Sequence, residues 1–386
     1  IEGLVQGVGF RPFVYRLAQQ YNLHGWVANT TSGVSVKVEG LAGHMACFVE
    51  DLRCKAPAVS VIEEITVQND VPEGLGEFVI LDSLDLSDET SEISPDIAVC
   101  AYCLEDMKHQ PHRIGYPFIN CTNCGPRFSI IMDFPYDRAK TTMAPFEMCP
   151  ECRKEYSDIS DRRFHAQPVA CNNCGPQYSL HTAGETITDF QKLIEIACSM
   201  IEKGAVVAMK GIGGFHLMCD ALNQGAVDRL RKIKIREGKP FAVMFRDVSA
   251  VRKYAEVTAV EEQALESWRR PVVILRSTSQ PAPGISLGLN TLGAFLPYMT
   301  VHYLLFEKLK TPAIVLTSGN LSDEPILIDN RAASATFSER LDALITFNRE
   351  IYNRSDDSVV RVIAERERVF RRSRGYAPAP VRLGFH

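Results

Sequence analysis

The amino-acid sequence predicts a multi-domain α/β protein, and three observations indicate this class. Residues 1–82 order their expected strands and helices as β-α-β-β-α-β, followed by a last strand. Residues 100–176 contain four Cys-x2-Cys pairs arranged as an internal repeat. From about residue 185 onward, helices alternate with short apolar strands, which is typical of a mixed α/β domain. A length of 386 residues allows about two or three such domains.

We divide the chain into four parts. They are a first domain at 1–82, a linker at 83–99, a cysteine-rich module at 100–180 and a large α/β domain at 185–386. The linker is acidic, rich in serine and weakly patterned, as connecting segments often are.

The first domain is expected to be a split βαβ sandwich of the ferredoxin-like type. After an opening strand, Pro12 suits the first turn of a helix. The expected strands that follow the opening one are 24–30, 33–40, 59–68 and 76–81. Two sets of apolar residues recur at helical spacing and predict the two helices: Val14, Leu17, Ala18 and Tyr21, then Met45, Phe48, Val49 and Leu52.

The turn between the opening strand and the first helix has the composition of an anion-binding loop. Gly7 and Gly9 can adopt positive φ, so that the backbone can approach a ligand closely. Successive N–H groups before a helix N-terminus form a concave site for an anion, and Arg11 adds a planar, permanently charged group that matches phosphate oxygens. Asn29 is expected to end a neighbouring strand beside this loop, where its carboxamide could orient a water molecule. An ordinary glycine turn before a helix would have a similar sequence.

The cysteine pairs have the spacing of zinc ligands. The motif CTNCGPRFS recurs 50 residues later as CNNCGPQYS, so two copies of one small module are the simplest explanation. The gaps between successive pairs are 17, 24 and 18 residues, and this near-symmetry favours two structural zinc sites of four cysteines each. The expected ligand sets are Cys100, Cys103, Cys121 and Cys124, and then Cys149, Cys152, Cys171 and Cys174. Interleaved pairing, disulfides and redox-active pairs are the alternatives, and His112 and His165 are expected to be ordinary loop histidines.

The large domain is predicted from six β-branched runs and an amphipathic helix. The helix is expected to begin after Thr188 or Asp189 and to stop at Gly204. The six runs are 205–209, 241–245, 271–275, 313–317, 343–347 and 358–362.

Two segments of this domain have the composition of a binding site for a nucleoside triphosphate. The segment LRKIKIREGKPF carries Lys234, Arg236 and Lys239 before an apolar strand. The segment AIVLTSGN places Ser318 and Asn320 at the carboxyl end of a strand, where ligands bind in α/β sheets. A solvated basic helix end is the alternative explanation for the first segment.

The first domain resembles acylphosphatase in GLVQGVGFRPFVYRLA and GWVANTTSGVSVKVEG. This resemblance implies that Arg11 binds the phosphate and that Asn29 positions the hydrolytic water. It also implies a phosphate-binding loop formed by Val5, Gln6, Gly7, Val8, Gly9 and Phe10.

The large domain resembles the YrdC/Sua5 family, whose K-x-R and S-x-N motifs bind ATP and whose members form carbamoyl-type adenylates. KGIGGFHLMCDA and NRSDDSVVRV extend the resemblance, and His216 within the former could meet a substrate or be structural. The residues that the resemblance implies for ATP and carbamoyl adenylate are Lys210, Lys234, Arg236, Lys239, Ser318 and Asn320.

The whole arrangement resembles the HypF family of hydrogenase-maturation carbamoyltransferases, as FINCTNCGPRFSII, DRRFHAQPVACNNCGP and RRSRGYAPAP also indicate. The resemblance implies a cytoplasmic enzyme that hydrolyses carbamoyl phosphate and uses ATP with Mg²⁺ to form carbamoyl adenylate. In the family, a C-terminal Kae1-like domain transfers the carbamoyl group to the C-terminal cysteine of HypE. We expect this chain to be the N-terminal portion without that domain.

Two other functions are alternatives. A tRNA threonylcarbamoyl-adenylate synthase would share the last domain but needs no acylphosphatase-like domain. A zinc-ribbon module could bind nucleic acid through the basic residues Arg113, Arg127, Arg138, Lys140, Arg162 and Arg163. The net charge of −5 argues against a nucleic-acid partner, and no apolar run approaches the ~18 residues of a membrane helix. The cysteine pattern favours a reducing cytoplasm.

Overall fold

The computed structural model describes residues 1–30, 33–57, 59–81, 93–236, 238–321 and 324–381. Its contacts divide the chain into two compact units. Unit 1 comprises Ile1–Pro95, Asn120–Ala170 and Pro378–His386, and unit 2 comprises Asp96–Ile119 and Cys171–Ala377. Residues 83–92 of the expected linker lie outside the described residues, whereas Ile97, Ala98 and Val99 are buried in unit 2. In the described part of the chain, no helix has the length and apolar character needed to cross a membrane.

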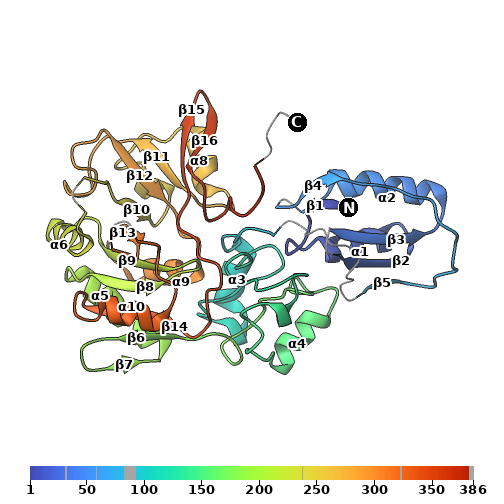
Figure 1. Ribbon diagram of the computed structural model, residues 1–386, viewed down its shortest axis with the longest axis horizontal. Coiled ribbons are helices and arrows are strands. Elements are labelled where there is room, and N and C mark those ends of the chain that lie inside the picture. The colour runs from blue at the N-terminus through green and yellow to red at the C-terminus, as the bar shows by residue number, and fades with distance from the viewer. Residues whose placement is uncertain (31–32, 58, 82–92, 237, 322–323, 382–386) are drawn as a thin grey trace. The chain divides into compact units, whose positions relative to one another are not determined.

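Unit 1 begins with the predicted α/β sandwich (Figure 1). Its elements are β1 (Glu2–Leu4), α1 (Phe10–Gln20), β2 (His24–Asn29), β3 (Val34–Glu39), α2 (Ala42–Cys54), β4 (Val61–Glu64) and β5 (Phe78–Ile80). Strand β1 pairs with β4, while β2 lies between an antiparallel β3 and a parallel β5. These two sets of paired strands join into one sheet through Ile1 and Val34, which exchange two backbone hydrogen bonds of 2.9 Å. The resulting order β4-β1-β3-β2-β5 confirms the ferredoxin-like prediction.

The helices of this sandwich bury part of each predicted apolar face. Helix α1 buries Val14, Leu17 and Ala18, together with Phe10 at its first turn. Helix α2 buries only Phe48 and Leu52 of the predicted set. Burial of one such apolar side chain contributes about 1.5–3 kcal/mol to stability, so these contacts fix both helices on the sheet.

The rest of unit 1 consists mostly of turns, with η2 (Arg138–Lys140) and α4 (Pro150–Ser157) as its helical segments. Backbone carbonyls that no regular ladder satisfies are bonded by arginine side chains. Arg138 donates to the carbonyls of Phe146, Gln167 and Val169, and Arg163 donates to that of Asn120. Charged side chains therefore hold this irregular segment together.

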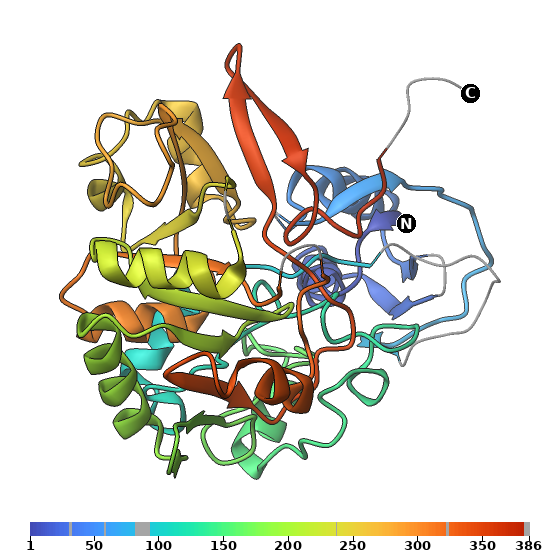
Figure 2. The same cartoon turned by 60° about the vertical axis from the view of Figure 1, so that its left-hand side comes forward.

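Unit 2 is built on one mixed sheet (Figures 1 and 2). Its strand order is β16-β15-β11-β12-β10-β13-β9-β8-β14-β6-β7. The strands are β6 (Tyr178–His181), β7 (Thr186–Ile187), β8 (Val207–Lys210), β9 (Phe215–Asp220), β10 (Ala242–Phe245), β11 (Val272–Arg276), β12 (Thr291–Phe295), β13 (Ala313–Ser318), β14 (Ala343–Phe347), β15 (Val359–Ile363) and β16 (Arg366–Arg371). The hairpin of β15 and β16 projects from the rest of this unit, and β16 is exposed along its whole length.

Helices cover this sheet and connect its strands. They are α3 (Ala101–His109), η1 (Pro111–Arg113), α5 (Phe190–Glu202), α6 (Gln224–Lys234), α7 (Val248–Val251), α8 (Ala259–Glu266), α9 (Thr300–Lys308) and α10 (Asn330–Phe337). Helices α5 and α6 both pack against β9. The side chain of Asp189 caps α5 by accepting from the N–H of Lys192, and Gly204 follows the helix with a φ of 88°, as predicted.

All six predicted strands of the large domain are present, as β8, β10, β11, β13, β14 and β15. The sheet also contains β9 and β12, which the sequence did not predict, in its central part. Strand β9 is buried on both faces, so its side chains do not alternate between apolar and polar.

Candidate functional site

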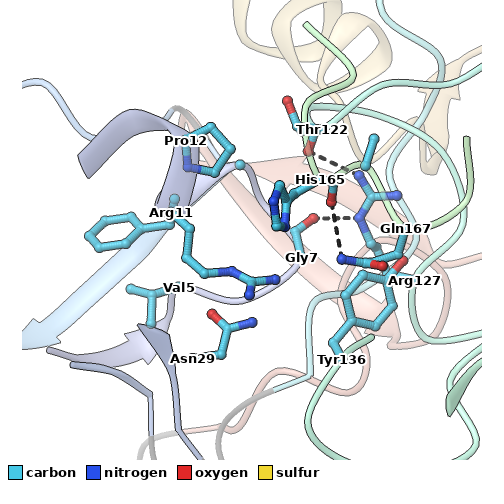
Figure 3. Close-up of a pocket in the computed structure, with 13 residues that line it drawn as sticks. Val5, Gly7, Arg11, Pro12, Asn29, Thr122, Arg127, Tyr136, His165 and Gln167 are labelled. Carbon is cyan, nitrogen blue, oxygen red and sulfur yellow. Dashed lines mark hydrogen bonds between the residues drawn. The ribbon is translucent and has the colours of Figure 1, made fainter. Parts of the chain in front are cut away.

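The glycine loop lies at a small pocket in unit 1 (Figure 3). The pocket has a volume of about 30 Å³, and the loop and α1 contribute Val5, Gly7, Gly9, Phe10, Arg11 and Pro12 to its lining. Gly7 and Gly9 have φ values of 71° and 77°, in the left-handed region that favours glycine. A Cβ at Gly9 would lie 3.1 Å from the side chains of Thr122 and Asn123. The loop therefore requires glycine for both its conformation and its contacts.

Arg11 and Asn29 meet at this pocket, as the sequence predicts. Arg11 is 8% exposed, and its Nη2 lies 3.6 Å from Oδ1 of Asp137. Asn29 ends β2 and is 2% exposed, and its Oδ1 has no hydrogen-bond partner within the described residues. A buried amide oxygen without a partner is costly to maintain unless something else binds it, such as a water molecule.

Gln6 bonds the glycine loop to Thr30 and Gly33, beyond the end of β2. Its Nε2 donates to the carbonyl oxygens of Thr30 and Gly33, at 2.6 and 2.9 Å. These bonds are buried, so they fix the strand end that carries Asn29 relative to the glycine loop. Of the predicted loop residues, Gln6 and Val8 support the pocket from behind and do not line it.

The remaining wall of the pocket comes from the cysteine-rich segment. It consists of Thr122, Arg127, Tyr136, His165, Ala166 and Gln167. Arg127 is buried, and its Nε donates a hydrogen bond to the carbonyl oxygen of Gly7. The hydroxyl of Tyr136 donates to the carbonyl of Pro126 at 3.3 Å. This wall was not predicted, because the cysteine spacing of the segment indicates metal binding alone.

The eight paired cysteines form the two predicted groups. In each group the four sulfur atoms all lie within 4.8 Å of one another. The groups are Cys100, Cys103, Cys121 and Cys124, and Cys149, Cys152, Cys171 and Cys174. The grouping follows the internal repeat, and the interleaved alternative is wrong.

The geometry of these groups fits a tetrahedral metal ion. The sulfur atoms of Cys121 and Cys124 are 3.8 Å apart, and those of Cys171 and Cys174 have the same separation. Two thiolates at about 2.3 Å from zinc in a tetrahedron are separated by about this distance, whereas a disulfide bond is about 2.05 Å long. The N–H groups of Asn123 and Asn173 each donate to the first sulfur of their pair at 3.4 Å. Both groups could therefore hold zinc with no open coordination position.

The K-x-R and S-x-N motifs of unit 2 meet at one edge of the sheet. Lys234 ends α6, and its Nζ donates to the carbonyl of Ser318 and to both oxygens of Asn320, the latter at 2.9 and 3.0 Å. The hydroxyl of Ser318 donates to Oδ1 of Asn320 at 2.8 Å. Burial, and secondarily the charge of Arg236, lowers the pKa of Lys234 to about 8.

Arg236 and Lys239 lie beside this edge, before β10. The guanidinium of Arg236 donates to the carbonyls of Lys239 and Pro240 at 3.1 and 2.7 Å and covers the ring of Phe241. Burial lowers the pKa of Arg236, while Lys239 is exposed. The basic segment is thus not merely a solvated helix end, because Lys234 and Arg236 donate to carbonyl groups of neighbouring segments.

Lys210 ends β8. Strand β9 lies between β8 and β13 and is antiparallel to both, so β8 and β13 run in the same direction. The Nζ of Lys210 is 2.9 Å from the carbonyl of Arg349 and 4.6 Å from the ring centroid of Phe347. Burial, and secondarily the charge of Arg349, lowers the pKa of Lys210 to about 8. The carboxyl ends of β8 and β13 share one edge, so Lys210 lies on the same side of the sheet as the S-x-N motif.

His216 pairs with Ser318 across β9 and β13, directly beside this motif. Its Nε2 lies 3.4 Å from Oδ2 of Asp357. The other oxygen of this carboxylate, Oδ1, accepts two hydrogen bonds from Arg374, at 2.8 and 3.0 Å. Burial opposes the charge of Asp357, but Arg374 and His216 outweigh it and hold the pKa of this carboxyl well below its usual range.

Comparisons with known proteins agree with this architecture. The acylphosphatase family model matches residues 1–80, and the HypF finger model matches 99–131 and 148–181. The model of Sua5, YciO and YrdC proteins, described as telomere recombination, matches 199–373. Carbamoyltransferase HypF of Rhodobacter capsulatus is 43% identical over 390 residues, which cover 99% of this chain and 51% of the relative. The chain belongs to the HypF carbamoyltransferase family.

Solved structures place the HypF fold over the whole chain. A crystal structure of full-length HypF in its phosphate- and nucleotide-bound form has a TM-score of 0.95 and 48% identity, and it covers 100% of this chain and 50% of that one. The acylphosphatase of Moorella thermoacetica is 40% identical over 85 residues, which are 22% of this chain and 90% of the relative. The chain thus spans about half the length of the HypF relatives that it matches.

The HypF match and the structure argue against the two alternative functions. The similarity covers the acylphosphatase-like and cysteine-rich segments as well as the last domain, which a threonylcarbamoyl-adenylate synthase would not require. Of the six expected nucleic-acid contacts, Arg113, Arg127 and Arg163 are buried, so these three cannot reach a nucleic-acid backbone.

The two copies of the repeat in this HypF-family chain differ at positions that line the pocket. At an offset of 50 residues, Thr122 and Arg127 correspond to Asn172 and Gln177. The cysteines and the Gly-Pro step are kept between the copies, whereas these pocket-lining positions differ.

Proposed function

We propose that this chain performs the first two steps of HypF carbamoyl transfer, beginning with hydrolysis of carbamoyl phosphate at the pocket of unit 1. One observation carries the proposal: the glycine loop, Arg11 and Asn29 line a single pocket of about 30 Å³. The match to the acylphosphatase family includes this loop and both side chains, and a HypF relative has been crystallised with phosphate bound.

The residues have complementary roles in this proposal. Backbone N–H groups of the glycine loop and the guanidinium of Arg11 bind the phosphoryl oxygens and stabilise the charge that develops on them. The Oδ1 of Asn29, which has no hydrogen-bond partner among the described residues, accepts a hydrogen bond from the attacking water and orients it toward phosphorus. Water adds to phosphorus as the bond from phosphorus to the acyl oxygen breaks, which yields inorganic phosphate and carbamate.

The second step is proposed at the sheet edge of unit 2. There ATP, bound with Mg²⁺, reacts with carbamate to give carbamoyl adenylate and pyrophosphate. Lys210, Lys234, Arg236 and Lys239 supply the positive charge for the triphosphate, and Ser318 and Asn320 supply polar contacts. The meeting of the K-x-R and S-x-N motifs at Lys234 and Asn320 supports this assignment. In HypF relatives of full length, we expect a further domain to transfer the carbamoyl group to the C-terminal cysteine of HypE.

We further propose that the two four-cysteine groups hold structural zinc. The sulfur separation of 3.8 Å and the use of all four ligand positions by cysteine support a closed site. Thiolates that bind metal rather than forming disulfides are typical of a reducing compartment, which supports the cytoplasm as the location.

Release of inorganic phosphate from carbamoyl phosphate tests the first step. We expect Arg11→Ala to lower kcat/KM by about a hundredfold or more, because the site loses a charge aimed at the phosphoryl group. Arg16→Ala is the matched control, since Arg16 lies on the exposed side of the same helix and should leave the rate unchanged. An Arg11→Ala variant that is folded and fully active would refute the assignment of the site.

Release of pyrophosphate from ATP tests the second step. It should require carbamate or carbamoyl phosphate, and Lys234→Ala should abolish it while leaving phosphate release intact. Loss of both activities in Lys234→Ala would instead mean that the two sites are not chemically separate.

A further inference from the structure

One position of the cysteine repeat has the same backbone conformation in both copies but a different residue. His165 has a φ of 55°, and its counterpart 50 residues earlier is Gly115, with a φ of 65°. Glycine adopts this left-handed conformation freely, whereas a residue with a Cβ adopts it only at a conformational cost. The first copy thus uses the residue that the turn favours, and the second copy keeps a histidine there against the local preference.

Strained residues of this kind persist where the surrounding structure determines them, often at functional sites. The N–H of His165 donates to the carbonyl of Tyr156 at 3.0 Å, and its carbonyl accepts from Nε2 of Gln167 at 3.2 Å. Its ring stacks on Tyr156 with centroids 5.1 Å apart and meets the edge of Phe164 at 4.4 Å. Both the backbone and the imidazole are therefore held in one orientation.

That orientation places the imidazole at the phosphate pocket. His165 lines the same cavity as Arg11 and Asn29, and Figure 3 shows its ring between Arg11 and Arg127. The acylphosphatase match ends at residue 80, so His165 is an addition to that module and not part of it. The neighbouring pocket residues Ala166 and Gln167 also differ from their counterparts, Tyr116 and Pro117.

We propose that His165 contacts the substrate in this pocket and donates a hydrogen bond from its imidazole to an oxygen of the bound acyl phosphate. The inference deepens the proposed hydrolysis and rests on it. Arg11 and the glycine loop supply donors from the acylphosphatase-like module, and His165 supplies one from the cysteine-rich segment. A small acyl phosphate such as carbamoyl phosphate would then be held by both segments, which explains why the second copy keeps a histidine where glycine fits better.

The test uses two variants that separate the ring nitrogens from the backbone. His165→Phe keeps an aromatic ring against Tyr156 but cannot donate. His165→Gly restores the residue of the first copy and leaves a space where free imidazole can bind. We expect both to lower kcat/KM for carbamoyl phosphate by about 10- to 100-fold, and added imidazole to restore activity to His165→Gly but not to His165→Phe. His109→Phe, an exposed histidine on α3, is the control and should be unaffected.

Binding of inorganic phosphate, measured by calorimetry, separates this inference from the proposed function. We expect His165→Phe to bind phosphate about tenfold more weakly than the unchanged chain. If the unchanged chain binds phosphate but does not hydrolyse carbamoyl phosphate, the proposed function fails and the binding ratio alone decides the role of His165. Equal phosphate affinity and equal kcat/KM in His165→Phe would overturn the inference. A chain that binds no phosphate at all would overturn both.

Discussion

Arg127, which follows a cysteine pair by three residues, donates a hydrogen bond from Nε to the carbonyl oxygen of Gly7 in the glycine loop. Its other nitrogens donate to the carbonyls of Pro126, Cys121 and Thr122, at 2.7, 3.1 and 3.0 Å. One buried side chain thus bonds both the cysteine knuckle and the loop proposed to bind phosphate, so a change at Arg127 should affect both.

We expect Arg127→Gln, which installs the residue of the second repeat copy, to lower the free energy of unfolding by about 3 kcal/mol, because several buried carbonyls lose a charged donor at once. Phosphate affinity should fall as well, since the carbonyl of Gly7 is no longer held. Chemical denaturation and calorimetry measure the two effects. Arg153→Gln, at an exposed position of α4, should change neither, and an equally stable Arg127→Gln variant would contradict the role of this bond.

Gly9→Ala should weaken both phosphate binding and folding. The new methyl group would meet Thr122 at 3.1 Å, and alanine is strained at a φ of 77°. We expect the free energy of unfolding to fall by about 1–2 kcal/mol and phosphate affinity to fall about tenfold. Gly43→Ala is the matched control, because a Cβ there meets nothing within 4 Å and alanine favours the helix. Gly43→Ala should raise the free energy of unfolding by up to about 1 kcal/mol. Identical behaviour of the two variants would show that the loop tolerates a side chain.

Serine substitutions at equivalent cysteines should each remove one metal ion. We expect two zinc ions per chain in the unchanged protein and one in Cys121→Ser or Cys171→Ser, measured by elemental analysis. Cys121→Ser should also weaken phosphate binding, because the carbonyl of Cys121 accepts from Arg127. Cys47→Ser, which changes an exposed cysteine outside both groups, should leave the zinc content unchanged. A variant at Cys121 that keeps both ions would contradict the assigned ligand set.

ATP binding should weaken as the pH rises through 8. Lys234 and Lys210 each have a pKa of about 8, so each is roughly nine-tenths protonated at pH 7 and one-tenth protonated at pH 9. Only the ammonium form attracts the triphosphate, and the affinity should therefore drop severalfold or more between these pH values. Lys234→Arg keeps its charge at pH 9, so its affinity should depend less steeply on pH, with the remaining dependence due to Lys210. An affinity that is constant from pH 7 to 9 would exclude both lysines from ATP binding.

The sequence predicted those parts of the fold that depend on local patterns. Strands such as β3 and β13 and helices such as α1 and α5 follow from their periodicity, caps and glycine stops. Strand β9 was missed because it follows a glycine turn and carries His216, Cys219 and Asp220, which do not form an alternating pattern. It is a strand because it is buried between β8 and β13, and no local pattern reports such a position.

The site shows the same difference between features set by local sequence and features set by tertiary contacts. Arg11, Asn29 and the glycine loop were predicted because they lie close in sequence and resemble a known motif. The wall formed by Arg127 and His165 was not, because it reaches the loop only through tertiary contacts more than a hundred residues away in sequence.

The bonds from Arg127 to the carbonyls around Cys121 have a consequence for how the protein matures. A newly made chain would fold its acylphosphatase-like sandwich and still have an open, one-sided loop until the cysteines acquire the proposed zinc. The proposed hydrolysis of an unstable acyl phosphate would then begin only in metal-loaded molecules, so that the supply of zinc would act as a checkpoint on that step.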